Sequence, residues 1–173
     1  MRAFGIAAAL LLFAMPRSGA AVEVVASAQV AAPAERVFAL LTDFEGWERV
    51  FSGFRVLRAE RIDAQSARVR QLTRVIGRPV ACTMAVKLRP AELRLDLVLD
   101  DREPNDLAEL ASYWQVVPLP DGGSRVELRV VTRSGLPIPG FVERGVVERS
   151  TRRTLDDLVR ALERATPDEV AAN

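Results

Sequence analysis

Few side chains in this sequence could carry out chemistry, and the most suggestive pair lies near its C-terminal end. Arg144 and Glu148 are four residues apart, which places them on one face of a helix. A buried Glu148 with a raised pKa could act as a general base, and it is the single candidate for a catalytic residue. The alternative is a solvent-exposed ion pair worth only a few tenths of a kcal/mol.

The composition excludes most other catalytic sites. The chain has no histidine and one cysteine, Cys82. Ser-His-Asp catalysis, Cys-His catalysis and histidine-bound zinc are therefore ruled out. No P-loop or glycine-rich dinucleotide motif occurs, and we expect no metal and no cofactor. Cys82 falls in the middle of an apolar strand face, which favours an inert buried thiol.

The first twenty residues have the features of a leader. Arg2 precedes an apolar run from Phe4 to Met15, and small residues follow at 18–20. The run is shorter than the ~20 residues that span a bilayer, and it is typical of a secretory signal peptide. An uncleaved N-terminal anchor is the alternative. We expect cleavage near Ala20, a periplasmic or secreted protein, one domain over 21–166, and a flexible tail over 167–173.

Without this leader the chain is nearly neutral. Arg2 and Arg17 account for two of the 24 Lys and Arg residues, which leaves 22 against 23 Asp and Glu, a formal charge of −1. Nucleic-acid binders usually carry a basic excess, so no nucleic-acid partner is expected. The length suits one domain with its own core, and we expect a monomer.

The elements that position these residues begin with a strand and two short helices. β-Branched residues over 22–30 predict the strand, and Pro33 fits the first turn of the following helix. Thr42 and Glu45 match a capping box, which predicts that a second short helix starts there and carries Trp47.

Alternating apolar and polar residues then predict six more strands. They begin at Phe54 and continue at 67–76, 80–88, 93–99, 107–117 and 124–133. Such strands, joined by short turns, form an antiparallel meander with one solvated face. The arginine-rich outer rows are expected to form cross-strand ion pairs on that face.

A helix of about 25 residues is predicted from Phe141 to about residue 165. Its second half carries an apolar stripe of Leu155, Leu158, Val159 and Leu162. The stripe, extended backward at the same spacing, reaches Thr151, Glu148, Arg144 and Phe141. Gly145 interrupts this half at a cost of ~1 kcal/mol relative to Ala. A kink there would instead turn Val142 and Val146 toward the sheet.

One apolar sheet face and one long helix must bury each other, which predicts an α+β helix-grip fold. In this fold a curved antiparallel sheet of about seven strands wraps around the C-terminal helix. The two short helices after the first strand close one end. The aromatic residues at 44–54 would form the lid and mouth, with Trp47 expected to be partly exposed.

Several segments resemble the START-like (SRPBCC) superfamily, which includes polyketide cyclase/dehydrase and coenzyme Q-binding groups. They are APAERVFALLTDFEGW at 32–47, VRQ at 69–71, YWQVVPLPDGGSRVEL at 113–128 and LPIPGFVER at 136–144. The resemblance covers roughly residues 22–165. Many relatives have Gly where this chain has Ser112, which could narrow the cavity.

The resemblance implies an apolar cavity beneath the last helix, which relatives use for lipids, quinones, sterols or aromatic polyketides. The candidate ligand-binding residues are Trp47, Phe51, Phe54, Gln71, Thr73, Met84, Leu97, Trp114, Phe141, Arg144, Gly145 and Glu148. Gly145 would leave room for the ligand. Alternatively, Gln71 and Thr73 are ordinary strand residues bonded to neighbouring backbone, and Trp114 only fills the core.

Two classes of function remain open. One is an exported carrier that holds an apolar small molecule, and the other is an enzyme resembling polyketide cyclases. Export favours the carrier, because polyketide intermediates are normally held in the cytoplasm. The segment GLPIPGFV at 135–142 could also make transient contact with a membrane or a partner protein.

Overall fold

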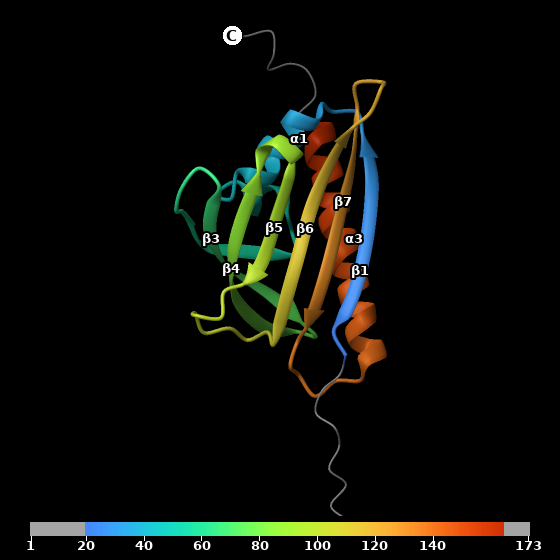
Figure 1. The fold of residues 1–173 in the computed structure, drawn as a ribbon. Helices are drawn as coiled ribbons and strands as arrows, with labels where there is room; N and C mark the ends of the chain where they lie inside the picture. Colours follow the sequence, from blue (N-terminus) through green and yellow to red (C-terminus); the bar gives the residue numbers. More distant parts are fainter. Residues whose placement is uncertain (1–19, 165–173) are drawn as a thin grey trace, which may run out of the picture.

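In the computed structural model, which describes residues 20–164, a seven-stranded antiparallel sheet wraps around one long helix (Figure 1). The predicted tail and all of the predicted leader except Ala20 lie outside these residues. The elements in chain order are β1 (Val22–Val30), α1 (Ala34–Thr42), α2 (Trp47–Val50), β2 (Phe54–Arg61), β3 (Ser66–Val75), β4 (Arg78–Arg89), the 3-10 turn η1 (Pro90–Glu92), β5 (Arg94–Leu99), β6 (Glu109–Pro118), β7 (Ser124–Arg133) and α3 (Gly140–Arg164).

The strand order across the sheet is β1-β7-β6-β5-β4-β3-β2, so β1 and β2 form its two edges. Strands β2 to β7 are a meander, and β1 joins it by pairing with β7. Helices α1 and α2 connect the two edges, and α1 lies beside the C-terminal end of α3 in Figure 1. The predicted helix-grip fold is confirmed.

The core lies between the inner face of the sheet and α3. Leu155, Leu158 and Leu162 of α3 are buried there, and Val37 and Leu41 of α1 close the same end. Helix α3 packs against β1 and β7, on one side of the curved sheet. Despite its length, neither α3 nor any other helix within residues 20–164 is apolar enough to cross a membrane.

The predicted capping box at Thr42 is wrong. Thr42 is the last residue of α1, and its hydroxyl donates to the carbonyl of Phe38 at 3.0 Å instead of capping a new helix. The side chain of Asp43 takes the capping position in the following turn and accepts from the Gly46 N–H at 3.0 Å. Helix α2 therefore begins at Trp47.

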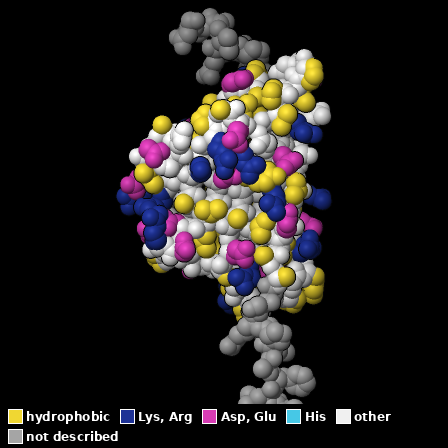
Figure 2. Space-filling view, in the orientation of Figure 1, with side chains coloured by type: hydrophobic (Ala, Val, Ile, Leu, Met, Phe, Trp, Pro, Cys, Tyr) yellow, Lys and Arg dark blue, Asp and Glu magenta, His cyan; other side chains and the backbone are white. Residues whose placement is uncertain are grey.

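The outer face of the sheet carries interspersed arginines and carboxylates (Figure 2). Arg129 on β7 pairs with Glu23 on β1 at 2.8 Å, and Arg94 pairs with Asp96 at 2.8 Å. The Arg129–Glu23 pair is cross-strand, as expected, whereas Arg94 and Asp96 lie on the same strand, β5. Because the Arg129–Glu23 pair is exposed, it contributes little to stability.

Candidate functional site

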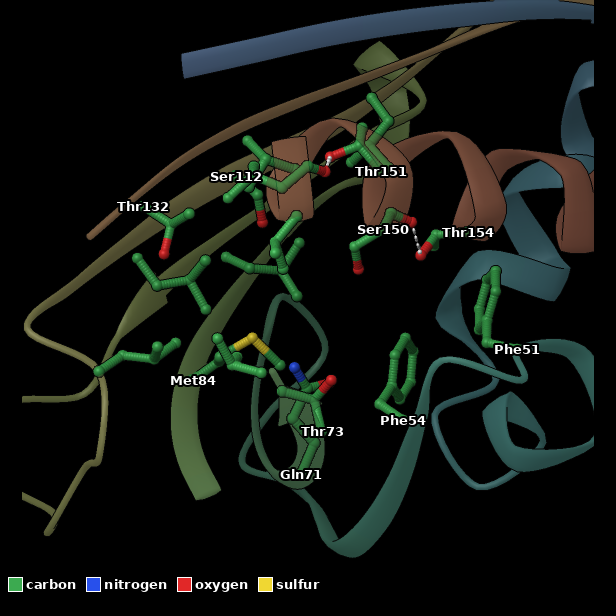
Figure 3. A pocket seen from close by; sticks show the side chains of 18 of the residues that line it. Phe51, Phe54, Gln71, Thr73, Met84, Ser112, Thr132, Ser150, Thr151 and Thr154 are labelled. Atoms are coloured by element: carbon green, nitrogen blue, oxygen red, sulfur yellow. Dashed lines mark hydrogen bonds between the residues drawn. The ribbon is translucent and has the colours of Figure 1, made fainter. Parts of the chain in front are cut away.

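A cavity of about 190 Å³ lies between α3 and the inner face of the sheet. Figure 3 shows Ser150 and Thr151 on the helix side of this space and Gln71, Thr73 and Met84 on the sheet side. The side chains and backbone that line it belong to Trp47, Phe51, Phe54, Gln71, Thr73, Arg74, Val75, Met84, Leu97, Leu107, Leu110, Ser112, Trp114, Leu128, Val130, Thr132, Val146, Val147, Ser150, Thr151 and Thr154. The lining is mainly apolar, as is usual for small-molecule pockets.

A cluster of aromatic rings closes the α2 end of the cavity. The ring of Trp47 meets Phe51 edge to face with 5.9 Å between centroids, and it meets Phe54 at 5.7 Å. Phe51 in turn lies 6.1 Å from Trp114. Such contacts stabilise an aromatic cluster beyond the area that it buries. Trp114 both fills the core and lines the cavity.

The expectation that Trp47 is partly exposed is wrong. Its side chain is buried, and its indole Nε1 donates to the carbonyl of Leu41 at 3.0 Å. That carbonyl lies at the end of α1, where backbone acceptors lack a partner within the helix. Trp47 thus joins α1 to α2 and presents one side of its ring to the cavity.

Most hydroxyl groups of the cavity donate to backbone carbonyls. Thr73 donates to Gly53 at 3.0 Å, and Thr132 donates to Glu109 at 2.9 Å. On α3, Thr151 donates to Val147 at 2.8 Å and Thr154 to Ser150 at 2.9 Å. Because their protons are engaged, these groups are left to accept hydrogen bonds from a ligand. This agrees with the alternative interpretation of Thr73 as a strand residue bonded to backbone, although Thr73 also lines the cavity.

Gln71 is directly opposite Cys82 across the β3–β4 pair. Burial raises the pKa of the Cys82 thiol, and a hydrogen bond with Gln71 offsets part of that effect. Cys82 is fully buried and is not among the cavity residues. A buried thiol with a raised pKa is a poor nucleophile, which agrees with the prediction that Cys82 is an inert buried thiol.

Four predicted ligand-binding residues lie outside the cavity. Phe141 is 79% exposed. Arg144 and Glu148 form a surface ion pair at 4.0 Å, and their side chains are 57% and 44% exposed. A Cβ atom on Gly145 would meet only the guanidinium of Arg149, at 3.4 Å, so this glycine borders the open surface of the helix and not the cavity. Glu148 is therefore not a buried base.

The sequence-based prediction chose the wrong inward face for the first half of α3. The buried stripe steps back by four residues at a time, from Leu155 to Thr151, Val147 and Glu143. The prediction used alternating steps of four and three. Since four residues turn a helix by about 40° more than a full turn, the buried face winds steadily around α3. Val146 lines the cavity although α3 continues through Gly145 as one helix.

Apart from Trp114, the sequence-based list omits the cavity residues of β6 and β7. Leu110, Ser112 and Trp114 alternate along β6, and Leu128, Val130 and Thr132 alternate along β7. The same period of two that identified these strands would have found them. Ser112, which was noted only as a difference from relatives, lies opposite Leu97 and Val130.

The start of α3 is fixed by a buried carboxylate. Glu143 accepts a hydrogen bond from the backbone N–H of Ser134 at 2.5 Å, which ties the helix to the end of β7.

Within residues 20–164, no group of three His, Cys, Asp or Glu side chains is placed to hold a metal ion.

The profile of one protein family, described as polyketide cyclase / dehydrase and lipid transport, matches residues 21–166. The chain belongs to this family. The match includes every strand and helix of the fold, and it confirms the resemblance to the START-like superfamily. No curated protein matches the chain.

Three solved structures share the fold. The ZhuI aromatase/cyclase from Streptomyces sp. R1128 is 20% identical with a TM-score of 0.74, over 86% of this chain and 98% of that one. A START superfamily protein from Mycobacterium smegmatis is 20% identical with a TM-score of 0.68, over 83% and 99%. A protein from Thermus thermophilus is 22% identical with a TM-score of 0.71, over 84% and 99%. Similarity at these identities establishes the fold only.

Proposed function

We propose that this protein is a non-catalytic binding or carrier protein that holds an apolar small molecule in the cavity between the sheet and α3. The observation that carries the proposal is the composition of the cavity wall. Aromatic and aliphatic side chains dominate it, and four of its hydroxyl groups donate to the protein's own backbone. Such a wall favours a lipid, quinone, sterol or polyketide through burial of apolar surface.

The alternative is an enzyme related to polyketide cyclases. The family description and the similarity to the ZhuI structure are the reasons to consider it. Proton transfer would need an acid or base within hydrogen-bonding reach of the ligand. Among residues 20–164, the cavity wall contains no Asp, Glu, His, Lys, Cys or Tyr, and its one charged residue is the exposed Arg74. This supports binding over catalysis.

Export is the second part of the proposal. It rests on the sequence of the first twenty residues, in which a short apolar run precedes small residues at 18–20. Intact mass of the protein recovered from the periplasm or culture medium tests it. We expect a species that begins near Ala21, and a species that still carries Met1 would contradict export with cleavage.

Native mass spectrometry of the protein purified from the cells that produce it tests the binding function, because a co-purified lipid or quinone would identify the ligand directly. Titration with a fatty acid, a quinone and a sterol gives a second measurement. The fluorescence of Trp47 and Trp114 should change, since both rings line the cavity. If no member of this panel binds with a Kd below ~100 μM, about −5.5 kcal/mol, the binding function is wrong. Chemical conversion of an aromatic polyketide would instead favour the enzyme.

A further inference from the structure

The cavity opens into a groove of about 890 Å³ on the side where α3 faces β2 and β3. The cavity and the groove adjoin each other, because five residues line both of them: Phe54, Thr73, Arg74, Val146 and Ser150. Helix α3 packs closely against β1 and β7 at the other edge of the sheet, which leaves this side as the opening. A ligand can therefore lie partly in the cavity and partly in the groove.

All four charged residues that line the groove are arginines. Arg55 on β2 and Arg74 on β3 come from the sheet, and Arg149 and Arg153 come from α3. Arg149 and Arg153 are four residues apart and so lie on the same face of the helix. The groove is thus lined by arginine residues of the sheet edge and of α3.

These four arginines differ from other arginines of the sheet in that they lack a carboxylate partner among the described residues. Arg68, Arg94 and Arg129 each have a carboxylate partner within 4 Å. Throughout residues 20–164, no carboxylate lies that close to any of the four groove arginines. Four like charges around one groove repel each other, and an anion placed among them would relieve that repulsion.

The size of the cavity adds an independent argument. Pockets for ordinary organic ligands measure ~300–1,000 Å³, and this cavity measures about 190 Å³. It can hold a ring or part of an acyl chain, since a cavity of ~150 Å³ binds benzene. The rest of a larger ligand would have to lie in the groove, beside the arginines.

We propose that the ligand is an anionic amphiphile whose apolar part fills the cavity and whose carboxylate or phosphate head binds Arg55, Arg74, Arg149 and Arg153. This inference rests on the proposed binding function and specifies its ligand class. Guanidinium groups bind both kinds of head through paired N–H donors. The groove is open to water, so added salt weakens the contribution of the head.

The test compares decanoate, decyl phosphate and decanol, which share one tail, by tryptophan fluorescence of the full chain at low salt and neutral pH. We expect both anions to bind at least about tenfold more tightly than decanol, a difference of ~1.4 kcal/mol. The ratio of the two anions shows whether carboxylate or phosphate is preferred. Inorganic phosphate without a tail should bind far more weakly than decyl phosphate.

The double variant Arg149→Gln/Arg153→Gln should reduce binding of the anions to nearly that of decanol and leave decanol unchanged. Arg152→Gln is the matched control, because Arg152 is an exposed arginine of the same helix that does not line the groove. All variants should keep the melting temperature of the wild type, since the replaced side chains are exposed.

The outcomes separate the two proposals. Equal binding of decanol and decanoate would overturn the anionic ligand and leave the binding function intact. If none of the three compounds binds, and the quinone and sterol also fail, both proposals are wrong. If the double variant loses binding only to vesicles that contain anionic lipid, the groove is a membrane contact, and the proposed head-group site is overturned.

Discussion

Asp157 on α3 holds Ser52, 105 residues earlier in the chain, through two hydrogen bonds to one carboxylate oxygen. Both the backbone N–H and the hydroxyl of Ser52 donate to Oδ2 at 2.8 Å, and Arg160 donates to the other oxygen. Ser52 lies between α2 and β2 and lines the groove. This contact fixes the mouth of the cavity to the helix that covers it.

Replacement of Asp157 should destabilise the protein and loosen the mouth. Asp157→Ala removes both hydrogen bonds that Ser52 donates to a buried charged carboxylate, and we expect a loss of ~1.5–3 kcal/mol in the free energy of unfolding, measured in urea. Ligand should also dissociate faster from the variant. Asp156→Ala is the control, because Asp156 is exposed and adjacent. Equal stability of the two variants would show that the contact with Ser52 is unimportant.

Stability should fall in acid as two buried carboxylates become protonated. Hydrogen bonds from Arg102 are the main reason that the pKa of Asp100 is lowered to about 2, and Arg68 adds to the effect. Burial by itself raises the pKa of Asp157, but the hydrogen bonds from Ser52 and Arg160 outweigh it, and the net shift is downward.

A lowered pKa stabilises the fold fully above the unfolded value of ~3.9, and this contribution is lost as pH falls through the folded value. For Asp100 the loss therefore occurs between about pH 4 and pH 2. Asp100→Asn should be less stable than the wild type at neutral pH, by ~1–3 kcal/mol. The difference should shrink across this acid range in urea titrations at successive pH values. A difference that stays constant down to pH 2 would contradict the assignment, and Asp101→Asn, at an exposed position, serves as control.

Gly145→Ala should stabilise the protein without weakening ligand binding. Space for the methyl group is available, and alanine is the better helix former by ~1 kcal/mol. Gly123→Ala provides the contrast, because its Cβ would lie 2.7 Å from the carbonyl oxygen of Val30 and should destabilise the fold. Thermal unfolding measures both effects. Weaker ligand binding by Gly145→Ala would show that Gly145 does line the ligand site.

Filling the cavity from β6 should block binding. In Ser112→Leu the larger side chain would project toward the space between Leu97 and Val130, and we expect affinity for apolar ligands to fall at least about tenfold, ~1.4 kcal/mol. Ala111→Leu is the control on the outer face of the same strand, where affinity should not change. Circular dichroism and melting temperature confirm that each variant is folded. Normal affinity in Ser112→Leu would place the ligand elsewhere.

The sequence by itself determined most of the helices and strands, and many of the sheet residues that line the cavity. A strand has a fixed period of two, so Gln71 and Thr73 had to share a face once β3 was recognised. One apolar sheet face and one long helix also admit few arrangements, which is why the helix-grip fold could be predicted. Eight of the twelve predicted ligand-binding residues line the cavity for these reasons: Trp47, Phe51, Phe54, Gln71, Thr73, Met84, Leu97 and Trp114.

Only the tertiary structure decided which face of α3 meets the sheet and which arginines meet one another. A helix has 3.6 residues per turn, and steps of three and four fit a short polar stretch equally well. The choice between Val147 and Glu148 therefore depended on packing against a curved sheet, which turns Val147 to the cavity and leaves Glu148 paired with Arg144 at the surface. Likewise, Arg55 and Arg149 lie far apart in sequence and come to the same groove only because the edge strand β2 and the helix α3 border one opening.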